Sequence, residues 1–155
     1  MEHPSAEEVG QGEWVGAERP EKLFTTGLGP CVGILVHNPE RSKAVLGHFV
    51  DPRMELEDFY GLVKHARAKM GEVLDQIVYL SGVAPIDESR KGLREAREIR
   101  KFVVESFLEM GYSKGQLSKS WNGLGEAATM AVDTESGEVA VNHFDYSHLN
   151  ESDED

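Results

Sequence analysis

The sequence predicts a single domain of the mixed α+β class. Short apolar segments of strand length follow one another across turn residues, and two longer segments carry apolar residues at helical spacing. Strands in successive hairpins, with only two helices beside them, are typical of α+β folds rather than of alternating α/β folds. A length of 155 residues suits one domain, and an apolar content of 39% is enough for a core.

The first predicted strands surround a glycine-rich turn. Residues 22–26 predict a short strand, which ends at residues 27–30, where the sequence reads GLGP. The apolar run at 31–37 predicts a central strand, because a strand that is covered on both faces shows no polar alternation. A turn at 38–42 then leads to a third strand at 43–50.

Two long helices and a final hairpin complete the predicted domain. Apolar residues recur at helical spacing over 54–74 and over 88–110, and a buried strand at 76–80 separates the two helices. Residues 127–132 and 138–144 predict the two strands of the last hairpin. The expected architecture is therefore a set of mainly antiparallel strands in hairpins with two long helices.

The two ends of the chain differ in composition from its body. Residues 1–20 combine glycine with acidic residues and predict a flexible arm, residues 21–148 form the domain, and residues 149–155 predict a disordered acidic tail. The first residues are neither basic nor apolar, so we expect no signal peptide. No apolar run reaches the roughly 20 residues that span a bilayer, so we expect no membrane insertion.

The charge and the cysteine content limit which classes of partner and which cellular compartment we expect. Sixteen basic residues against 28 acidic ones give a net charge of −12, which repels phosphate backbones and argues against nucleic-acid binding. A single cysteine excludes an intrachain disulfide and suits the reducing cytoplasm, where we expect the protein to act. His143, Asp145 and His148 lack further ligands at diagnostic spacing, so we expect no metal.

The lone cysteine follows a glycine turn that suits a nucleophile. A single cysteine is most often a small buried core residue. Gly27 and Gly29, however, allow a sharp turn before Cys31, so that amide N–H groups can converge near the thiol. Such groups lower the pKa of a thiol and can hold an oxyanion, and the amides of Gly29 and Cys31 are the candidates. Pro30 contributes no N–H to this turn.

His48 is the candidate general base. If residues 39–42 form the loop, paired residue numbers in the hairpin sum to 81, and His48 then faces Gly33. Cys31 shares a strand face with Gly33, which makes it a diagonal neighbour of His48 at roughly 7–8 Å between Cα atoms. Thr25, on the strand that enters the glycine turn, can orient the imidazole through its hydroxyl. A register slip of one residue would move His48 to the other face.

The segments around the cysteine and the histidine resemble a known family signature. Residues 25–34 read TTGLGPCVGI and residues 46–49 read LGHF, which is similar to the signature of the CheD family of chemoreceptor glutamine deamidases. The resemblance continues more weakly to the last predicted hairpin. It implies the CheD-like α/β sandwich and a catalytic set in which Cys31 is the nucleophile, His48 the general base and acid, and Thr25 the group that orients His48.

Two segments depart from the family pattern. Pro30 stands where the family usually has serine, and Glu126 stands about where a basic residue is expected. In the family, the surface formed by the segment before the last hairpin recognises a chemoreceptor helix or the CheC phosphatase partner. In this chain we expect Trp121, Asn122 and Gly123 to line the rim of a substrate groove.

The predicted function is cysteine-dependent deamidation of a glutamine side chain in a partner protein, with release of ammonia and with no cofactor. The resemblance implies a chemoreceptor-like helix as the substrate and a role in chemotaxis signalling. Amide or methyl-ester hydrolysis by the same pair is a related hypothesis. The alternative from a different class is a non-catalytic CheD-like binding module, in which Cys31 is a core residue. Both hypotheses leave the oligomeric state open.

Overall fold

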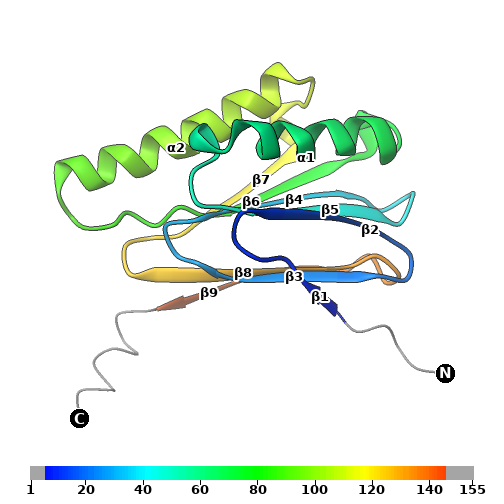
Figure 1. Cartoon of the computed structure of the whole chain (residues 1–155), viewed down its shortest axis with the longest axis horizontal. Helices are drawn as coiled ribbons and strands as arrows, with labels where there is room; N and C mark the ends of the chain where they lie inside the picture. Colours follow the sequence, from blue (N-terminus) through cyan, green and yellow to red (C-terminus); the bar gives the residue numbers. More distant parts are fainter. Residues whose placement is uncertain (1–5, 146–155) are drawn as a thin grey trace, which may run out of the picture.

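A computed structural model describes residues 6–145 of the chain. In this range the chain forms two long helices and nine strands in two sheets, so the predicted α+β class with mostly antiparallel strands is confirmed. Figure 1 shows three layers, in which the helices cover one face of a five-stranded sheet and a four-stranded sheet covers the other. The two sheets form a sandwich, and the predicted tail at 149–155 lies outside the described residues.

The five-stranded sheet has the order β2-β5-β4-β6-β7. Its strands are β2 (Glu13–Glu18), β5 (Lys43–Phe49), β4 (Val32–Asn38), β6 (Ile77–Gly82) and β7 (Leu117–Trp121). β4 lies at the centre and is buried along its whole length, as its apolar run predicts. β6 and β7 are parallel, whereas the other neighbouring pairs are antiparallel.

The β4–β5 hairpin has the predicted register. Gly33 pairs with His48 and Asn38 pairs with Lys43, so the numbers of paired residues sum to 81 as expected. A side chain at Gly33 would collide with Leu28 and Met130, because a Cβ atom there would come within 2.5 Å of each. His48 therefore lies on the face of the five-stranded sheet that packs against the four-stranded sheet.

The four-stranded sheet has the order β1-β3-β8-β9. Its strands are β1 (Ala6–Glu8), β3 (Lys22–Leu28), β8 (Glu126–Asp133) and β9 (Val139–Asp145). β3 pairs with β8 rather than with β4, so the turn that follows β3 crosses from one sheet to the other. The β3–β8 register shifts between Thr25 and Leu28, which marks an irregularity just before that turn.

The prediction of a flexible arm over residues 1–20 was wrong for the part that the structure describes. β1 pairs in parallel with β3, and β2 is the edge strand beside β5. The glycines that indicated an arm instead form the link between these strands, where Gly12 has a φ of +84° and donates its N–H to the His48 carbonyl. The N-terminal segment thus contributes one strand to each sheet.

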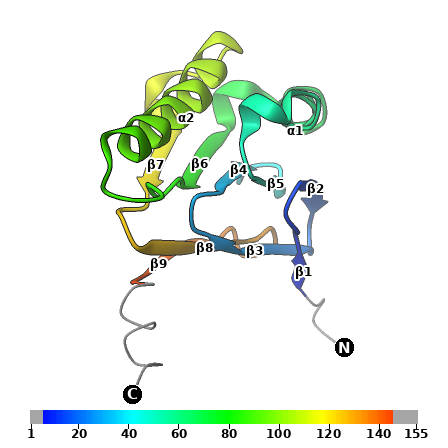
Figure 2. The same cartoon turned by 60° about the vertical axis from the view of Figure 1, so that its left-hand side comes forward.

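α1 (Leu56–Lys69) and α2 (Arg90–Glu109) lie on the same face of the five-stranded sheet, as Figure 2 shows. Their inward sides join a core cluster that includes the fully buried Phe59 and Phe107. The apolar periodicity that predicts the two helices includes Leu56 and Leu93, but both are exposed in the first turn of their helices. No helix within residues 6–145 is long and apolar enough to cross a membrane.

The two faces of the five-stranded sheet bury different side chains. Toward the helices the core is apolar and rich in aromatic rings, which make edge contacts such as Phe49 with Phe59. Toward the four-stranded sheet the core is aliphatic, with Leu35, Leu46 and Met130 among its members. This second layer also buries polar side chains, which are Thr25, His37, His48 and Ser81.

Candidate active site

One end of the sandwich brings together the loops that carry the predicted site residues. β4 begins at this end, and β5, β6 and β7 finish there, because Val32 pairs with Phe49 and with Gly82, and Gly82 pairs with Trp121. In Figure 1 this is the end where α2 begins and β9 finishes. The turn before β4 and the loops after β5, β6 and β7 therefore meet around Cys31.

The glycine turn gives Cys31 its position. Gly27 has a φ of +69° and neither Gly27 nor Gly29 has a heavy atom within 4 Å of its Cβ position, so the turn is open on its outer side. The Gly29 N–H donates to the Gly27 carbonyl at 3.0 Å. Gly29 was predicted as an oxyanion donor, but this turn bond engages its amide. The N–H of Cys31 is the remaining member of the predicted pair.

The loop after β6 braces the turn. The N–H of Val83 donates to the Cys31 carbonyl at 2.9 Å, and the N–H of Ala84 donates to the Gly29 carbonyl at 2.9 Å. Gly82 must be glycine, since a Cβ there would lie 2.0 Å from the Cys31 carbonyl oxygen. Val83 has a φ of +57°, which costs a β-branched residue of the order of 1–3 kcal/mol. Backbone strain of this kind is typical of functional sites.

Thr25 determines which nitrogen of His48 carries the proton. The Thr25 hydroxyl is fully buried and donates its one hydrogen to the Val9 carbonyl at 2.7 Å. The same oxygen lies 2.8 Å from His48 Nδ1, so it can only accept a hydrogen bond from that nitrogen. In the neutral ring Nδ1 is therefore protonated, and Nε2 carries the free lone pair.

His48 Nε2 is a buried basic atom without a partner. The His48 side chain is 5% exposed, and Nε2 makes no hydrogen bond to any described residue. Burial lowers the pKa of His48, while the nearby carboxylate of Glu55 acts in the opposite direction. The ring is therefore neutral near pH 7 and able to accept a proton at Nε2.

Cys31 is half-buried, and its resting form is the thiol. Burial raises the pKa of Cys31, and the negative charge of Glu55 raises it further. This direction is opposite to the one that the glycine turn predicts. His48 Nε2 has no hydrogen-bond partner, so no bond joins it to the Cys31 sulfur in this state. A reaction at this sulfur needs a proton transfer to His48 as the thiol attacks.

Asn122 clamps the glycine turn from the side of β7. Its side chain is 2% exposed, and Nδ2 donates to the carbonyls of Leu28 and Gly29 at 2.5 and 3.0 Å. Oδ1 accepts a hydrogen bond from His143 Nδ1 at 2.8 Å, which leaves His143 Nε2 to pair with the Ser120 hydroxyl at 2.7 Å. This chain of contacts links β9 and β7 to the turn that presents Cys31.

The residues predicted to line a groove are placed differently. Trp121 lies under the Arg100 guanidinium, which is 5.7 Å from the ring centroid. Asn122 is buried as a clamp, and Gly123 donates its N–H to Glu126 Oε1. None of these three residues lines the groove beside the glycine turn. That groove has a volume of about 400 Å³, and its lining residues are Gly27, Gly29, Pro30, Ala84, Pro85, Ile86, Gly125, Glu126 and Ala127.

Several residues of this end have no recognisable signal in the sequence. Ser81 pairs with Gly33 across from His48, and its buried hydroxyl has no partner among the described residues. Arg100 donates to the carbonyls of Val83 and Asn122, at 2.8 and 2.6 Å, from the middle of α2. The clamp by Asn122 and the field of Glu55 also depend on long-range contacts. Spacing along the chain therefore does not reveal them.

His143 takes part in this polar network rather than in a cluster of metal ligands. Within residues 6–145, no three histidine, cysteine, aspartate or glutamate side chains come close enough to hold a metal ion. His148, which the sequence places near His143, lies outside the described residues.

Comparison with known proteins gives no family assignment. No protein-family model matches the chain, and no curated protein matches it. Among solved structures it is similar to the hypothetical protein YfiH of Bacillus licheniformis, with a TM-score of 0.49 and 15% identity. The similarity covers 69% of this chain and 49% of that protein, so the chain spans about half of its length. A likeness of this size says nothing of what either protein does.

Proposed function

We propose that the protein is a cysteine-dependent amidohydrolase that converts a glutamine side chain of a partner protein to glutamate. The observation that carries this proposal is the hydrogen-bonded order Val9–Thr25–His48. It holds the neutral ring with a buried Nε2 that has no partner among the described residues, on the side of β5 that faces the core cluster against which Cys31 packs.

The first step forms a carbon–sulfur bond. As Cys31 Sγ attacks the side-chain carbonyl carbon of glutamine, its proton moves to His48 Nε2 and the carbonyl electron pair moves onto oxygen. In this mechanism the Cys31 N–H holds the resulting oxyanion. The imidazolium keeps its Nδ1–H bond to Thr25, and the charge of Glu55, which raises the pKa of His48, stabilises it.

The second half of the reaction releases ammonia and then glutamate. The oxyanion collapses and the carbon–nitrogen bond breaks, while His48 returns its proton to the leaving nitrogen, so that ammonia departs and a thioester remains. Water then gives a proton to Nε2 and attacks the thioester. The carbon–sulfur bond breaks, the thiolate takes the proton back, and glutamate leaves. The low pKa of His48 suits this cycle, because the ring must begin each half as a base.

The resemblance to the CheD deamidases supports the same assignment of roles. Cys31, His48 and Thr25 stand at the positions of that family's nucleophile, base and orienting residue. A helix of a chemoreceptor-like protein is accordingly the first candidate substrate, and the cytoplasm the expected compartment. The departures at Pro30 and Glu126 make the chemistry better supported than the chemotaxis role.

Ammonia release from glutamine-containing peptides tests the proposal. Wild-type protein and the Cys31→Ala variant are incubated with a mixture of such peptides, and mass spectrometry follows conversion of glutamine to glutamate. We expect conversion with the wild type and none above background with Cys31→Ala. Equal conversion by both proteins would exclude Cys31 as the nucleophile.

A non-catalytic binding module is the second candidate, favoured by the raised pKa of Cys31. An unreactive thiol would be inert toward substrate, and the same loops would serve only to hold a partner. This alternative predicts that Cys31→Ala binds a partner protein as tightly as the wild type does, and that neither converts glutamine. Calorimetric titration of a candidate receptor fragment against both proteins distinguishes the two.

A further inference from the structure

The end that carries Cys31 holds most of the large apolar side chains that are exposed in residues 6–145. Eight large apolar side chains are exposed in the described residues, and only Leu74 among them belongs to the loop at the far end of α1. Five lie on the loops and the helix start around the Cys31 turn, and these are Val50, Met54, Leu56, Ile86 and Leu124. Exposed apolar side chains that gather in this way mark interaction surfaces.

These side chains lie on two sides of the nucleophile. Val50, Met54 and Leu56 belong to the segment after β5, and Glu55 within it acts electrostatically on both Cys31 and His48. Ile86 belongs to the loop after β6 and forms a wall of the groove beside the glycine turn. A chain segment that crosses Cys31 would therefore meet apolar surface before and after its reacting side chain.

The charge of this end is negative. Glu126 is the single charged residue of the groove lining, and Glu57 and Asp58 are exposed beside Leu56. Arg53 does not offset them, because its guanidinium is bound by Asp51 and Glu95. Asp87 and Glu88, next to Ile86, are matched by two basic residues in the first turn of α2. Arg100 also lies at this end, where it donates to the carbonyls of Val83 and Asn122, but Glu57, Asp58 and Glu126 outnumber it in a chain of net charge −12.

We propose that this surface binds a substrate segment in which the glutamine is flanked by a large apolar side chain and by lysine or arginine. The apolar side chain fills the groove between Pro30 and Ile86, and the cation lies in the field of Glu55 and Glu126. The identity of the reacting side chain rests on the proposed function, whereas the docking does not require the reaction.

Three synthetic peptides test the chemistry of the partner. All have a central glutamine; the first has leucine neighbours and flanking lysines, the second leucines and glutamates, and the third glycines and lysines. Docking is read as protection of Cys31, the chain's one cysteine, from iodoacetamide at mildly alkaline pH, and reaction is read as ammonia release. We expect the first peptide to protect at concentrations at least about tenfold lower than the other two.

A matched pair of variants tests where on the surface the peptide docks. Ile86 and Leu74 are 75% and 84% exposed, so an aspartate at either position leaves the buried core intact. Ile86→Asp should raise the protecting concentration of the first peptide about tenfold or more, and Leu74→Asp should leave it unchanged. An equal effect of both variants, or equal protection by all three peptides, would overturn the proposed docking.

The two readouts separate this proposal from the proposed function. Protection by the first peptide without ammonia release keeps the docking surface and refutes the deamidase. Ammonia release that does not distinguish the peptides keeps the deamidase and refutes the docking specificity. If no peptide protects Cys31, the docking proposal fails whatever the ammonia assay shows.

Discussion

His48 and His37 are two buried histidines in the same layer of the sandwich, but the groups around them differ. Both lie on adjacent strands and point toward the four-stranded sheet, at 5% and 2% exposure. Burial lowers the pKa of each, and each has an unpartnered Nε2. Of the two, only His48 has the Thr25 hydroxyl at Nδ1 and lies at the Cys31 end of the sheet, where its neighbour Phe49 pairs with Val32. Burial of a histidine is thus no mark of a site; its oriented partners are.

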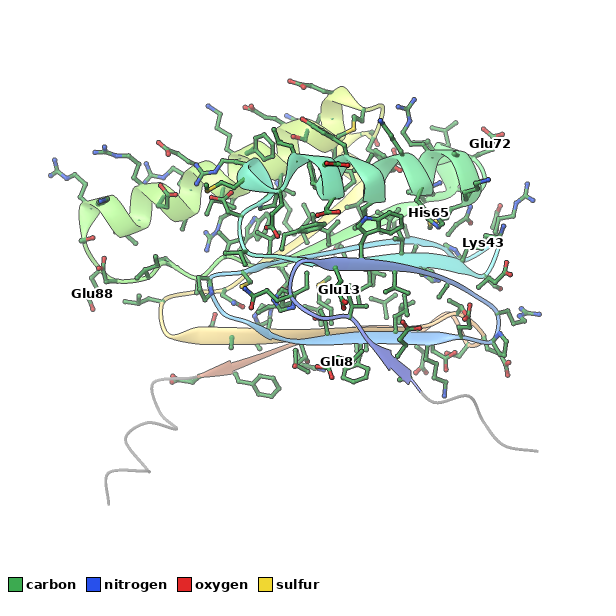
Figure 3. All side chains as sticks on the ribbon, in the orientation of Figure 1. Glu8, Glu13, Lys43, His65, Glu72 and Glu88 are labelled. Atoms are coloured by element: carbon green, nitrogen blue, oxygen red, sulfur yellow. The ribbon has the colours of Figure 1, made fainter. Side chains whose placement is uncertain are left out.

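The regions around these histidines differ in the same way. The end near His37 closes with the β4–β5 hairpin, and Figure 3 shows Lys43, His65 and Glu72 there, far from Glu88 at the Cys31 end. A hollow of about 380 Å³ opens beside Lys43 and His65, but its lining holds neither a thiol nor a hydroxyl. The end near His48 combines a strained backbone, a thiol and an apolar groove.

Replacing each histidine in turn is the strongest test of this difference. His48→Ala should reduce ammonia release about 10²–10⁴-fold, because it removes the general base, while His37→Ala should leave the rate per folded molecule unchanged. Both variants open a cavity in the same layer, so urea unfolding should show similar losses of stability. Equal losses of activity would mean that both substitutions reduce activity only by destabilising the fold.

Substitution of Thr25 tests the orientation of His48. Thr25→Val removes the acceptor for His48 Nδ1–H and the donor for the Val9 carbonyl, so the free energy of unfolding should fall by about 1–3 kcal/mol. Turnover should fall about tenfold or more, whereas Thr25→Ser, which keeps the hydroxyl, should retain most of the rate. A pH profile of turnover that is identical in Thr25→Val and wild type would contradict the role.

Asn122 provides a smaller test at the same end. Asn122→Ala removes a buried donor to the Leu28 carbonyl, a second donor to the Gly29 carbonyl and the acceptor for His143, which should cost about 1–3 kcal/mol in urea unfolding. Asn142→Ala is the matched control, because Asn142 is an exposed asparagine on the neighbouring β9. If Asn122→Ala is no less stable than Asn142→Ala, the clamp contributes nothing.

The lowered pKa values of His37 and His48 should both contribute to the pH dependence of stability. Burial lowers the pKa of His37 and of His48 in the folded state, so the unfolded chain binds protons first as the pH falls. Stability should therefore be full above about pH 6.5 and decline as the pH decreases through and below that value. Melting curves at a series of pH values should show a weaker decline in His37→Ala than in the wild type. An unchanged decline would contradict the assignment.

The elements that the sequence predicts well are those determined by neighbouring residues. The β4–β5 register follows from a short loop and from strand alternation, which together place His48 opposite Gly33. The helices follow from apolar periodicity, with differences at their ends. β7 was missed because only one of its five residues is buried, and β2 because it lies among glycines and acidic residues.

The partners of β3 and Asn122 could not be predicted in this way. β3 was expected only to lead through the glycine turn into β4, and nothing in the sequence shows that it pairs with β8, about 100 residues later. The amide of Asn122 reaches the carbonyl of Leu28 across 94 positions of the chain. The role of Thr25 as the group that orients His48 was expected from its place on the strand before the glycine turn and from the family resemblance, but the contact itself joins two different sheets.

The pairing of β3 with β8 has a consequence for the order in which the molecule is made. A ribosome releases β1 and β3 well before β8, because β8 follows β3 by roughly 100 residues. Until then, Thr25 has no sheet to hold it against His48. Contacts between distant segments also make folding slow. During synthesis the Cys31 thiol is therefore exposed before Thr25 and His48, the groups proposed to activate it, are in contact.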